Sequence, residues 1–135
     1  MNLVIDASLV AAWILPNEDE TALPWLDVVA ADGASTTGLF PFEISNVLLM
    51  AERRKRITEA ELLRAHGDLA ALAIAIEGPP TAAVLTDIMQ LARLHGLSFY
   101  DASYLELAIR LNSRLGSLDE ALRKAAQAAG VSLCP

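Results

Sequence analysis

Hydrophobic positions along the chain alternate between short apolar runs and longer segments with helical spacing. The short runs are typical of strands that are buried inside a sheet, and they lie at residues 2–5, 34–38, 114–118 and 131–133. In the longer segments, apolar residues recur every three or four positions, which predicts helices. These segments cover residues 8–14, 20–32, 41–56, 58–72, 81–95, 101–111 and 119–129.

Residues at the ends of these segments favour the same boundaries. Pro41 suits the first turn of a helix, and Thr58 with Glu61 has the spacing of a capping box. Gly96 and Gly130 each stand where a helical segment ends. The alternation of strands and helices predicts an α/β fold with a mostly parallel central sheet, flanked by helices on both faces.

The composition agrees with a single domain over residues 1–135. The chain is 54% hydrophobic and 20% charged, which is enough apolar material for a sizeable core. No apolar run reaches the roughly 18 residues of a membrane span, and no basic segment precedes an apolar block at the N-terminus. The one cysteine, Cys134, excludes an internal disulfide. We therefore expect a soluble, cytoplasmic protein.

The net charge of −7 argues against a nucleic-acid partner, because proteins that bind phosphates usually present a basic surface. The distribution of charge matters more than its total, however. Four bases lie side by side at residues 53–56, although they also suit the dipole of a helix C-terminus. Candidates for contacts with a phosphate backbone are Arg53, Arg54, Lys55, Arg56, Arg110 and Arg114, with Arg123 and Lys124 as further ones.

Four acids stand where a parallel sheet would hold a ligand. Asp6 and Asp119 each follow a predicted strand, and ligands bind beyond the carboxyl ends of parallel strands. Glu43 and Asp101 lie in the first turns of their helices, and Asn46 follows Glu43 one turn later. Taken singly, each acid is explained as a helix cap or as a partner of the helix dipole.

Capping boxes are possible at the starts of the two helices that follow Ser98 and Ser117. Ser98 with Asp101, and Ser117 with Glu120, both have the required spacing. Helix capping does not explain Glu43 and Asn46, a polar pair that is expected on the inner face of an apolar helix, where unpaired polar groups are unfavourable. The alternative is that the four acids converge on one site.

Convergence of four carboxylates would cause strong repulsion, which a divalent cation relieves. A ligand set made only of oxygen favours Mg²⁺ or Mn²⁺ over zinc. His66 and His95 have no ligand spacing to Cys134, which also argues against zinc. A carboxylate-held Mg²⁺ activates water and stabilises charge on phosphate oxygens. The pattern therefore indicates phosphoryl or phosphodiester chemistry, and the spacing does not choose between them.

The segments around these acids resemble the blocks of one known family. In order along the chain they are "VIDASLVAAW", "PFEISNVL", "LSFYDASYLELA" and "LGSLDEALRKAAQAAGV". Together they resemble the PIN-domain family, in particular the ribonuclease toxins of VapBC-type toxin–antitoxin systems. The resemblance covers essentially the whole chain, and none of the four acids departs from it.

This resemblance implies a parallel sheet flanked by helices, and endoribonuclease activity that depends on Mg²⁺ or Mn²⁺. The products would carry a 5′-phosphate and a 3′-hydroxyl. Asp6, Asp101 and Asp119 match the metal-binding acids. Glu43 matches the remaining acid, which binds metal directly or through water and assists proton transfer. The supporting polar positions are matched by Ser8, Asn46 and Ser117.

The same resemblance implies three partners: an RNA substrate, a VapB-type antitoxin and a second copy of the chain. Two other kinds of Mg²⁺ protein fit less well. A phosphohydrolase of the haloacid dehalogenase type needs an aspartate where this chain has Ser8, and a receiver domain needs a lysine near its last strands. A catalytically inert PIN domain that acts as a binding module is the alternative from another functional class.

Overall fold

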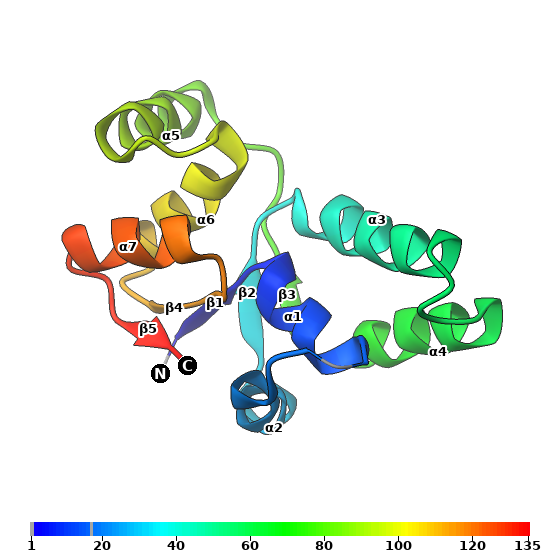
Figure 1. The fold of residues 1–135 in the computed structure, drawn as a ribbon. Helices are drawn as coiled ribbons and strands as arrows, with labels where there is room; N and C mark the ends of the chain where they lie inside the picture. The colour runs from blue at the N-terminus through cyan, green and yellow to red at the C-terminus, as the bar shows by residue number, and fades with distance from the viewer. Residues whose placement is uncertain (1, 17) are drawn as a thin grey trace.

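A single parallel sheet forms the centre of the protein in this computed structural model, which describes residues 2–16 and 18–135. The strand order is β3-β2-β1-β4-β5. The strands are β1 (Leu3–Ile5), β2 (Ala34–Thr36), β3 (Ile74–Ile76), β4 (Arg114–Gly116) and β5 (Leu133–Cys134). The predicted α/β class with a parallel sheet is therefore confirmed (Figure 1).

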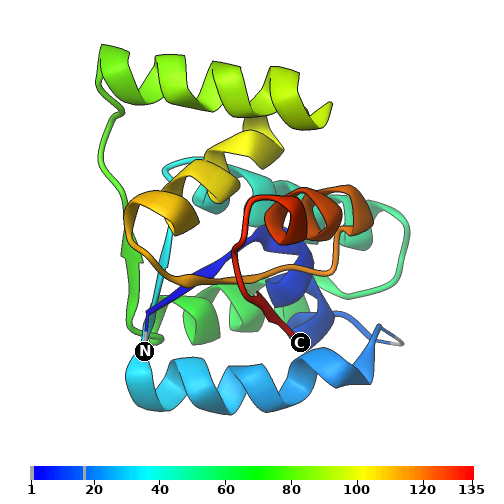
Figure 2. The same cartoon turned by 90° about the vertical axis from the view of Figure 1, so that its left-hand side faces the viewer.

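Helices cover both faces of this sheet, as predicted. Figure 1 shows α6 and α7 on one side of the strands and α1, α3 and α4 on the other, while Figure 2 shows α5 along the outer side of α6. The helices are α1 (Ala7–Ile14), α2 (Leu23–Asp32), α3 (Phe40–Arg53), α4 (Glu59–Ala70), α5 (Ala82–His95), α6 (Phe99–Arg110) and α7 (Glu120–Ala128), with a 3₁₀ turn η1 at Glu20–Ala22. Among the described residues, no helix has both the length and the apolar character that spanning a bilayer requires.

Three differences from the sequence prediction matter for the fold, in addition to shifts of one to three residues at other helix and strand ends. The strand β3 was not predicted, because its residues continue an apolar run that begins in α4. The segment 20–32 forms a 3₁₀ turn and a helix rather than one helix. Helix α6 begins at Phe99, two residues early, because the Ser98 hydroxyl caps it by accepting a hydrogen bond from the Asp101 N–H.

The strand order reverses direction next to β1. From β1 the chain proceeds outward to β2 and β3, and it then returns to the other side of β1 with β4 and β5. Val4 pairs with Ser35 on one side and with Leu115 on the other. In an open parallel sheet, the crevice at such a switch point is where ligands bind. Here the switch point lies between β1 and β4, whose last residues are Ile5 and Gly116.

The core that supports this edge is tightly packed and apolar. Ile5, Leu9, Leu105 and Leu122 are fully buried between the sheet and the helices. Gly116 is required at the end of β4, because a Cβ there would lie 2.7 Å from a methyl carbon of Leu9. The first helix therefore packs directly against the last residue of β4, which brings the two strand ends together.

Candidate active site

Asp6 follows β1 directly and is the N-cap residue of α1. Its Oδ1 accepts a hydrogen bond from the Leu9 N–H at 3.0 Å, as a helix cap does. The same oxygen accepts one from the Ser8 hydroxyl at 2.7 Å, and Oδ2 accepts one from the Ser117 hydroxyl at 2.5 Å. The explanation of Asp6 as a cap is therefore correct but incomplete, since both carboxylate oxygens are held in place.

The two serines join the end of β1 to the turn between β4 and α7. The Ser8 oxygen accepts a hydrogen bond from the Leu118 N–H at 2.9 Å, and the Ser117 oxygen accepts one from the Asp119 N–H at 3.1 Å. The capping box that the spacing of Ser117 and Glu120 suggested is not formed, because Ser117 is not the N-cap residue of α7. Asp119 takes that position and accepts a hydrogen bond from the N–H of Leu122 at 2.8 Å.

The protein environment makes the charged form of Asp6 unfavourable. Asp6 is only 4% exposed, and this burial raises the pKa of its carboxyl group from 3.8 to about 6. Hydrogen bonds from Ser117, Ser8 and Leu9 lower that pKa, and the negative charge of Asp101 raises it. A cation bound near these carboxylates would stabilise their charged forms.

Asp101 and Asp119 extend the same group of acids. Asp101 is the third residue of α6 and is half-buried. Burial and the charge of Asp119 raise the pKa of Asp101, while a hydrogen bond with Ser98 lowers it. Asp101 therefore interacts electrostatically with Asp6 on one side and with Asp119 on the other.

Glu43 lies in the first turn of α3, where its carboxylate is held by Tyr104 of α6. The Tyr104 hydroxyl donates a hydrogen bond of 2.8 Å to Oε1 of Glu43. Burial raises the pKa of Glu43, the hydrogen bond from Tyr104 lowers it, and the charge of Asp101 raises it. All four predicted acids are thus connected through hydrogen bonds or electrostatic interactions that include Asp101.

The acids have the donor chemistry for a hard divalent cation, since all their ligand atoms are carboxylate oxygens. Within residues 2–16 and 18–135, no three His, Cys, Asp or Glu side chains are grouped so that they could hold a metal ion together. Mg²⁺ usually keeps several water molecules and binds through one or two carboxylates together with substrate phosphates. The arrangement fits that mode better than a closed cage of protein ligands.

The supporting residue Asn46 makes no hydrogen bond to the acids among the described residues. It was expected with Glu43 on the inner face of α3, but it is exposed. It lines a shallow groove of about 210 Å³ together with Leu15 and Arg54. The helical spacing placed Asn46 correctly relative to Glu43, but not relative to the core.

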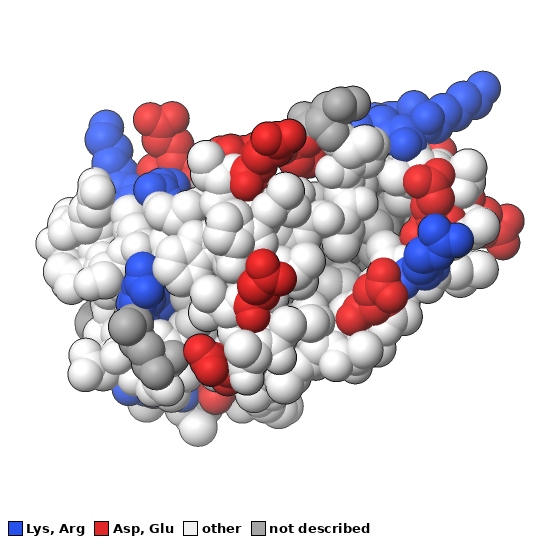
Figure 3. All heavy atoms as spheres, turned by 90° about the horizontal axis from the view of Figure 1, so that it is seen from below, with Lys and Arg blue, Asp and Glu red and all other residues white. Residues whose placement is uncertain are grey.

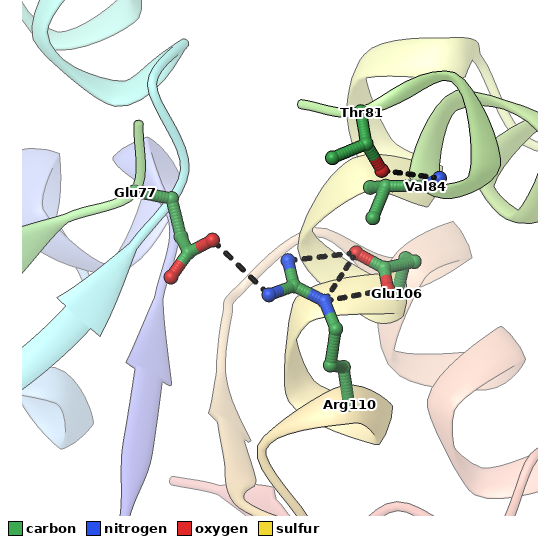
Figure 4. Close-up of polar contacts among 5 residues, drawn as sticks. All are labelled: Glu77, Thr81, Val84, Glu106 and Arg110. Carbon is green, nitrogen blue, oxygen red and sulfur yellow. Dashed lines mark hydrogen bonds and ion pairs between the residues drawn. The ribbon is translucent and has the colours of Figure 1, made fainter. Parts of the chain in front are cut away.

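Several of the predicted phosphate-binding bases are already paired. Arg56 donates hydrogen bonds to the Pro16 carbonyl oxygen and to Glu18. Figure 4 shows Arg110 between Glu106 of its own helix and Glu77 after β3, with ion pairs of 2.9 and 3.1 Å. Arg114 lies over the ring of Trp25 and contacts the carbonyl oxygen of Leu133. By contrast, Arg53, Arg54 and Lys55 are exposed at the end of α3.

The face of the protein seen from below carries mixed charges. In Figure 3, carboxylates are spread across the middle of this face, and most basic side chains lie toward its margins. This distribution matches the net charge of −7. Contacts to a phosphate backbone on this face would therefore depend on individual bases rather than on a broad basic surface.

Two residues that position the acids were not predicted to have this role. Tyr104 is 1% exposed and orients Glu43, and its place three residues after Asp101 was the only signal for it in the sequence. Arg123 donates hydrogen bonds to the carbonyl oxygens of Ser117 at 2.9 Å and Pro135 at 3.0 Å. It supports the turn that carries Ser117, whereas the sequence suggested a phosphate contact.

Comparisons with known proteins agree with this geometry. The model of the PIN domain matches residues 3–128. The chain is 34% identical over 122 residues to Ribonuclease VapC3 of Pyrobaculum aerophilum, which covers 90% of this chain and 92% of that protein.

Solved structures share the fold. PAE2754 from Pyrobaculum aerophilum superposes with a TM-score of 0.75 at 22% identity, over 98% of this chain and 89% of that chain. VapC20 of Mycobacterium tuberculosis, a toxin that cleaves the sarcin–ricin loop, gives a TM-score of 0.67 at 18% identity, over 99% of this chain and 100% of that chain. The matches in sequence and fold together show that this chain belongs to the PIN-domain family.

Proposed function

We propose that this PIN-domain protein is a metal-dependent endoribonuclease and the toxin of a VapBC-type toxin–antitoxin pair. The observation that carries the proposal is Asp6, a buried carboxylate whose two oxygens are fixed by three donors at the switch point of the sheet. A buried acid with a raised pKa and acidic neighbours is typical of a functional site. The 34% identity to a ribonuclease supports the choice of RNA as substrate.

The proposed roles follow from what each side chain can do. Asp6, Asp101 and Asp119 are the proposed carboxylates for Mg²⁺ or Mn²⁺; one or two of them would bind the ion directly, and oxygens of the substrate phosphate would complete its coordination. A bound divalent cation lowers the pKa of a water molecule and neutralises charge on phosphate oxygens. Ser8 and Ser117 keep Asp6 oriented through their hydroxyl donors.

Glu43 is the proposed site of proton transfer. Burial raises the pKa of its carboxyl group, which brings the pKa closer to neutral pH and makes the carboxylate a better proton acceptor. The Tyr104 hydroxyl holds Oε1, so that the carboxylate keeps one orientation as it gains or loses a proton. Tyr104 is a positioning residue in this scheme.

The proposed partners of the protein are an antitoxin and a second copy of the chain, as the resemblance to VapC-type toxins implies. A basic side chain of an antitoxin would complement the concentrated negative charge at Asp6, Asp101 and Asp119. Binding there would block access of RNA and metal together.

Cleavage of total bacterial RNA by the purified protein tests the proposal. Wild type should cleave in the presence of Mg²⁺ or Mn²⁺ and not in EDTA, while Asp101→Asn should be inactive with an unchanged circular dichroism spectrum. Asp68→Asn, which changes an exposed acid on α4, is the matched control and should remain active. Cleavage in EDTA, or full activity of Asp101→Asn, would contradict the proposal, and an inactive folded wild type would favour the inert binding module.

A further inference from the structure

A second feature lies at the same edge of the sheet as the acids. The loops that follow β2 and β3, together with α5 and one side of α6, line an open pocket of about 580 Å³. Pockets for small ligands commonly measure about 300–1,000 Å³. Because all five strands are parallel, the ends of β2 and β3 lie beside the ends of β1 and β4, where Asp6 and Ser117 are located.

The pocket is connected to the proposed active site through α6. Phe99 and Tyr100 line the pocket, and the next residue along the helix is Asp101. On the other side, Thr37 lines the pocket and contacts the hydroxyl of Tyr104, which holds Glu43. A molecule in the pocket would therefore lie next to the acids rather than on a separate face of the protein.

Most of the pocket surface is apolar and suits a flat ring. Tyr100 is 59% exposed beside the pocket, and Val84, Leu85 and Ile88 of α5 contribute aliphatic side chains. Nucleobases stack readily on exposed aromatic side chains in proteins that bind single-stranded nucleic acids. The aromatic residues at the start of α6 thus provide a stacking surface next to Asp101.

The charged end of the pocket disfavours a phosphate group. Arg110 is the only basic residue among those that line the pocket. Its guanidinium group already donates hydrogen bonds to two carboxylates. It forms a double contact with Glu106 at 2.9 and 3.1 Å and a further contact of 3.1 Å with Glu77 (Figure 4). Two carboxylates and one guanidinium leave net negative charge, which favours a neutral group with N–H donors.

Glu77 is the residue placed to accept such donors. Arg110 contacts its Oε2, and no donor among the described residues contacts Oε1. The side chain is 40% exposed at this end of the pocket. Carboxylates accept hydrogen bonds from the exocyclic amino group of cytosine in known recognition pairs, and adenine and guanine also carry amino groups. Uracil has no amino group, and its single donor, N3–H, lies between two carbonyl oxygens, which a carboxylate repels.

We propose that this pocket binds an amino-bearing nucleobase of the RNA, stacked on Tyr100 and contacted by Glu77, next to the phosphodiester that is cleaved. The inference rests on the proposed ribonuclease function for its biological meaning. If an apolar protein segment filled the pocket instead, the Glu77 carboxylate would lose contact with water and gain no hydrogen-bond donor, which is unfavourable.

Binding of free nucleosides tests the pocket without requiring catalysis. We would titrate cytidine, adenosine, guanosine and uridine into metal-free protein with ¹³C-labelled methyl groups and follow the signals by NMR. The methyl signals of Val84 and Leu85 should shift with the three amino-bearing nucleosides, at concentrations about tenfold lower than with uridine. The methyl signals of Leu94, which is exposed on the same helix outside the pocket, should not shift.

A matched pair of variants completes the test. Leu85→Trp fills the pocket and should abolish the nucleoside shifts, whereas Leu94→Trp makes the same change outside it and should retain them. Glu77→Gln should bring the affinities for cytidine and uridine within about twofold, because an amide both donates and accepts hydrogen bonds. Absence of shifts in the wild type, or equal affinity for all four nucleosides, would overturn the proposal.

Cleavage assays separate this inference from the proposed function. If RNA is cleaved and Leu85→Trp leaves its rate and sequence preference unchanged, the pocket assignment fails while the ribonuclease assignment stands. If amino-bearing nucleosides bind but no RNA is cleaved under any condition, the ribonuclease assignment fails instead. If Leu85→Trp but not Leu94→Trp dissociates a dimer in sedimentation experiments, the pocket belongs to a protein interface and the proposal is overturned.

Discussion

Replacement of Asp6 by asparagine should stabilise the metal-free protein at neutral pH, because the change removes a buried negative charge. The pKa of Asp6 rises from 3.8 to about 6 in the folded protein. Since the folded pKa is higher than the unfolded one, stability is lost as the pH rises from about 4 to about 6. One pKa unit corresponds to about 1.4 kcal/mol, so the loss amounts to about 3 kcal/mol.

Urea unfolding followed by tryptophan fluorescence in EDTA measures this effect. The free energy of unfolding of Asp6→Asn, relative to wild type, should increase by about 2.5 kcal/mol between pH 4 and pH 7.5, because the unfolded carboxyl group is already partly ionised at pH 4. Hydrogen bonds that the amide makes less well lower the stability of the variant at both pH values and do not change this difference. Added Mg²⁺ should then stabilise wild type more than the variant, because only the wild type has the carboxylate that would bind it.

Asp19→Asn is the matched control for this experiment. Asp19 also caps a helical turn, but it is exposed, and hydrogen bonds from Thr21 lower its pKa. Its replacement should give no gain in stability as the pH rises. A difference between Asp6→Asn and wild type that stays constant from pH 4 to pH 7.5 would refute the conclusion that Asp6 is a buried, unfavourably charged group.

Three further substitutions test the supporting structure. Tyr104→Phe removes the hydrogen bond that lowers the pKa of Glu43, so the acidic limb of the pH–rate profile for RNA cleavage should move to higher pH; movement to lower pH would contradict the assignment. Arg123→Gln loses contacts to the Ser117 carbonyl oxygen and should lower both the cleavage rate and the unfolding free energy, the latter by about 1 kcal/mol in urea titration; an unchanged rate would exclude a positioning role. Gly33→Ala should lower stability by more than about 1 kcal/mol in thermal unfolding, because Gly33 has φ +77° and an added Cβ would lie 2.8 Å from a backbone oxygen; an unchanged melting temperature would be inconsistent with this backbone geometry.

Much of the fold follows from local sequence patterns. The strands β1, β2, β4 and β5 are short segments between helical ones, and this alternation was enough to locate them, although β5 begins two residues later than predicted. Strand β3 was missed because Ile74–Ile76 directly continues the apolar run of α4, so that hydrophobicity alone does not separate helix from strand. Its identity as a strand depends on backbone pairing with β2, which is a tertiary interaction.

The proximity of the acids in the candidate site was predictable for a different reason. Asp6 and Asp119 follow strands, and the parallel topology brings such positions to one edge. What the sequence does not contain is the contact partner of each side chain. Tyr104 meets Glu43 across 61 positions of sequence, and Ser117 meets Asp6 across 111. Asn46 was misplaced because helical spacing defines neighbours on a helix but not which face is buried.

The proposed function depends on whether the acids around Asp6 form a site that cleaves RNA. Mapping of new 5′-phosphate RNA ends after brief expression in a bacterial host, with wild type and Asp101→Asn side by side, tests this most directly. Discrete ends that occur only with wild type are the predicted result, and their positions would identify the RNA that is cut. The same set of ends in both samples, with soluble and folded protein in each, would contradict the account.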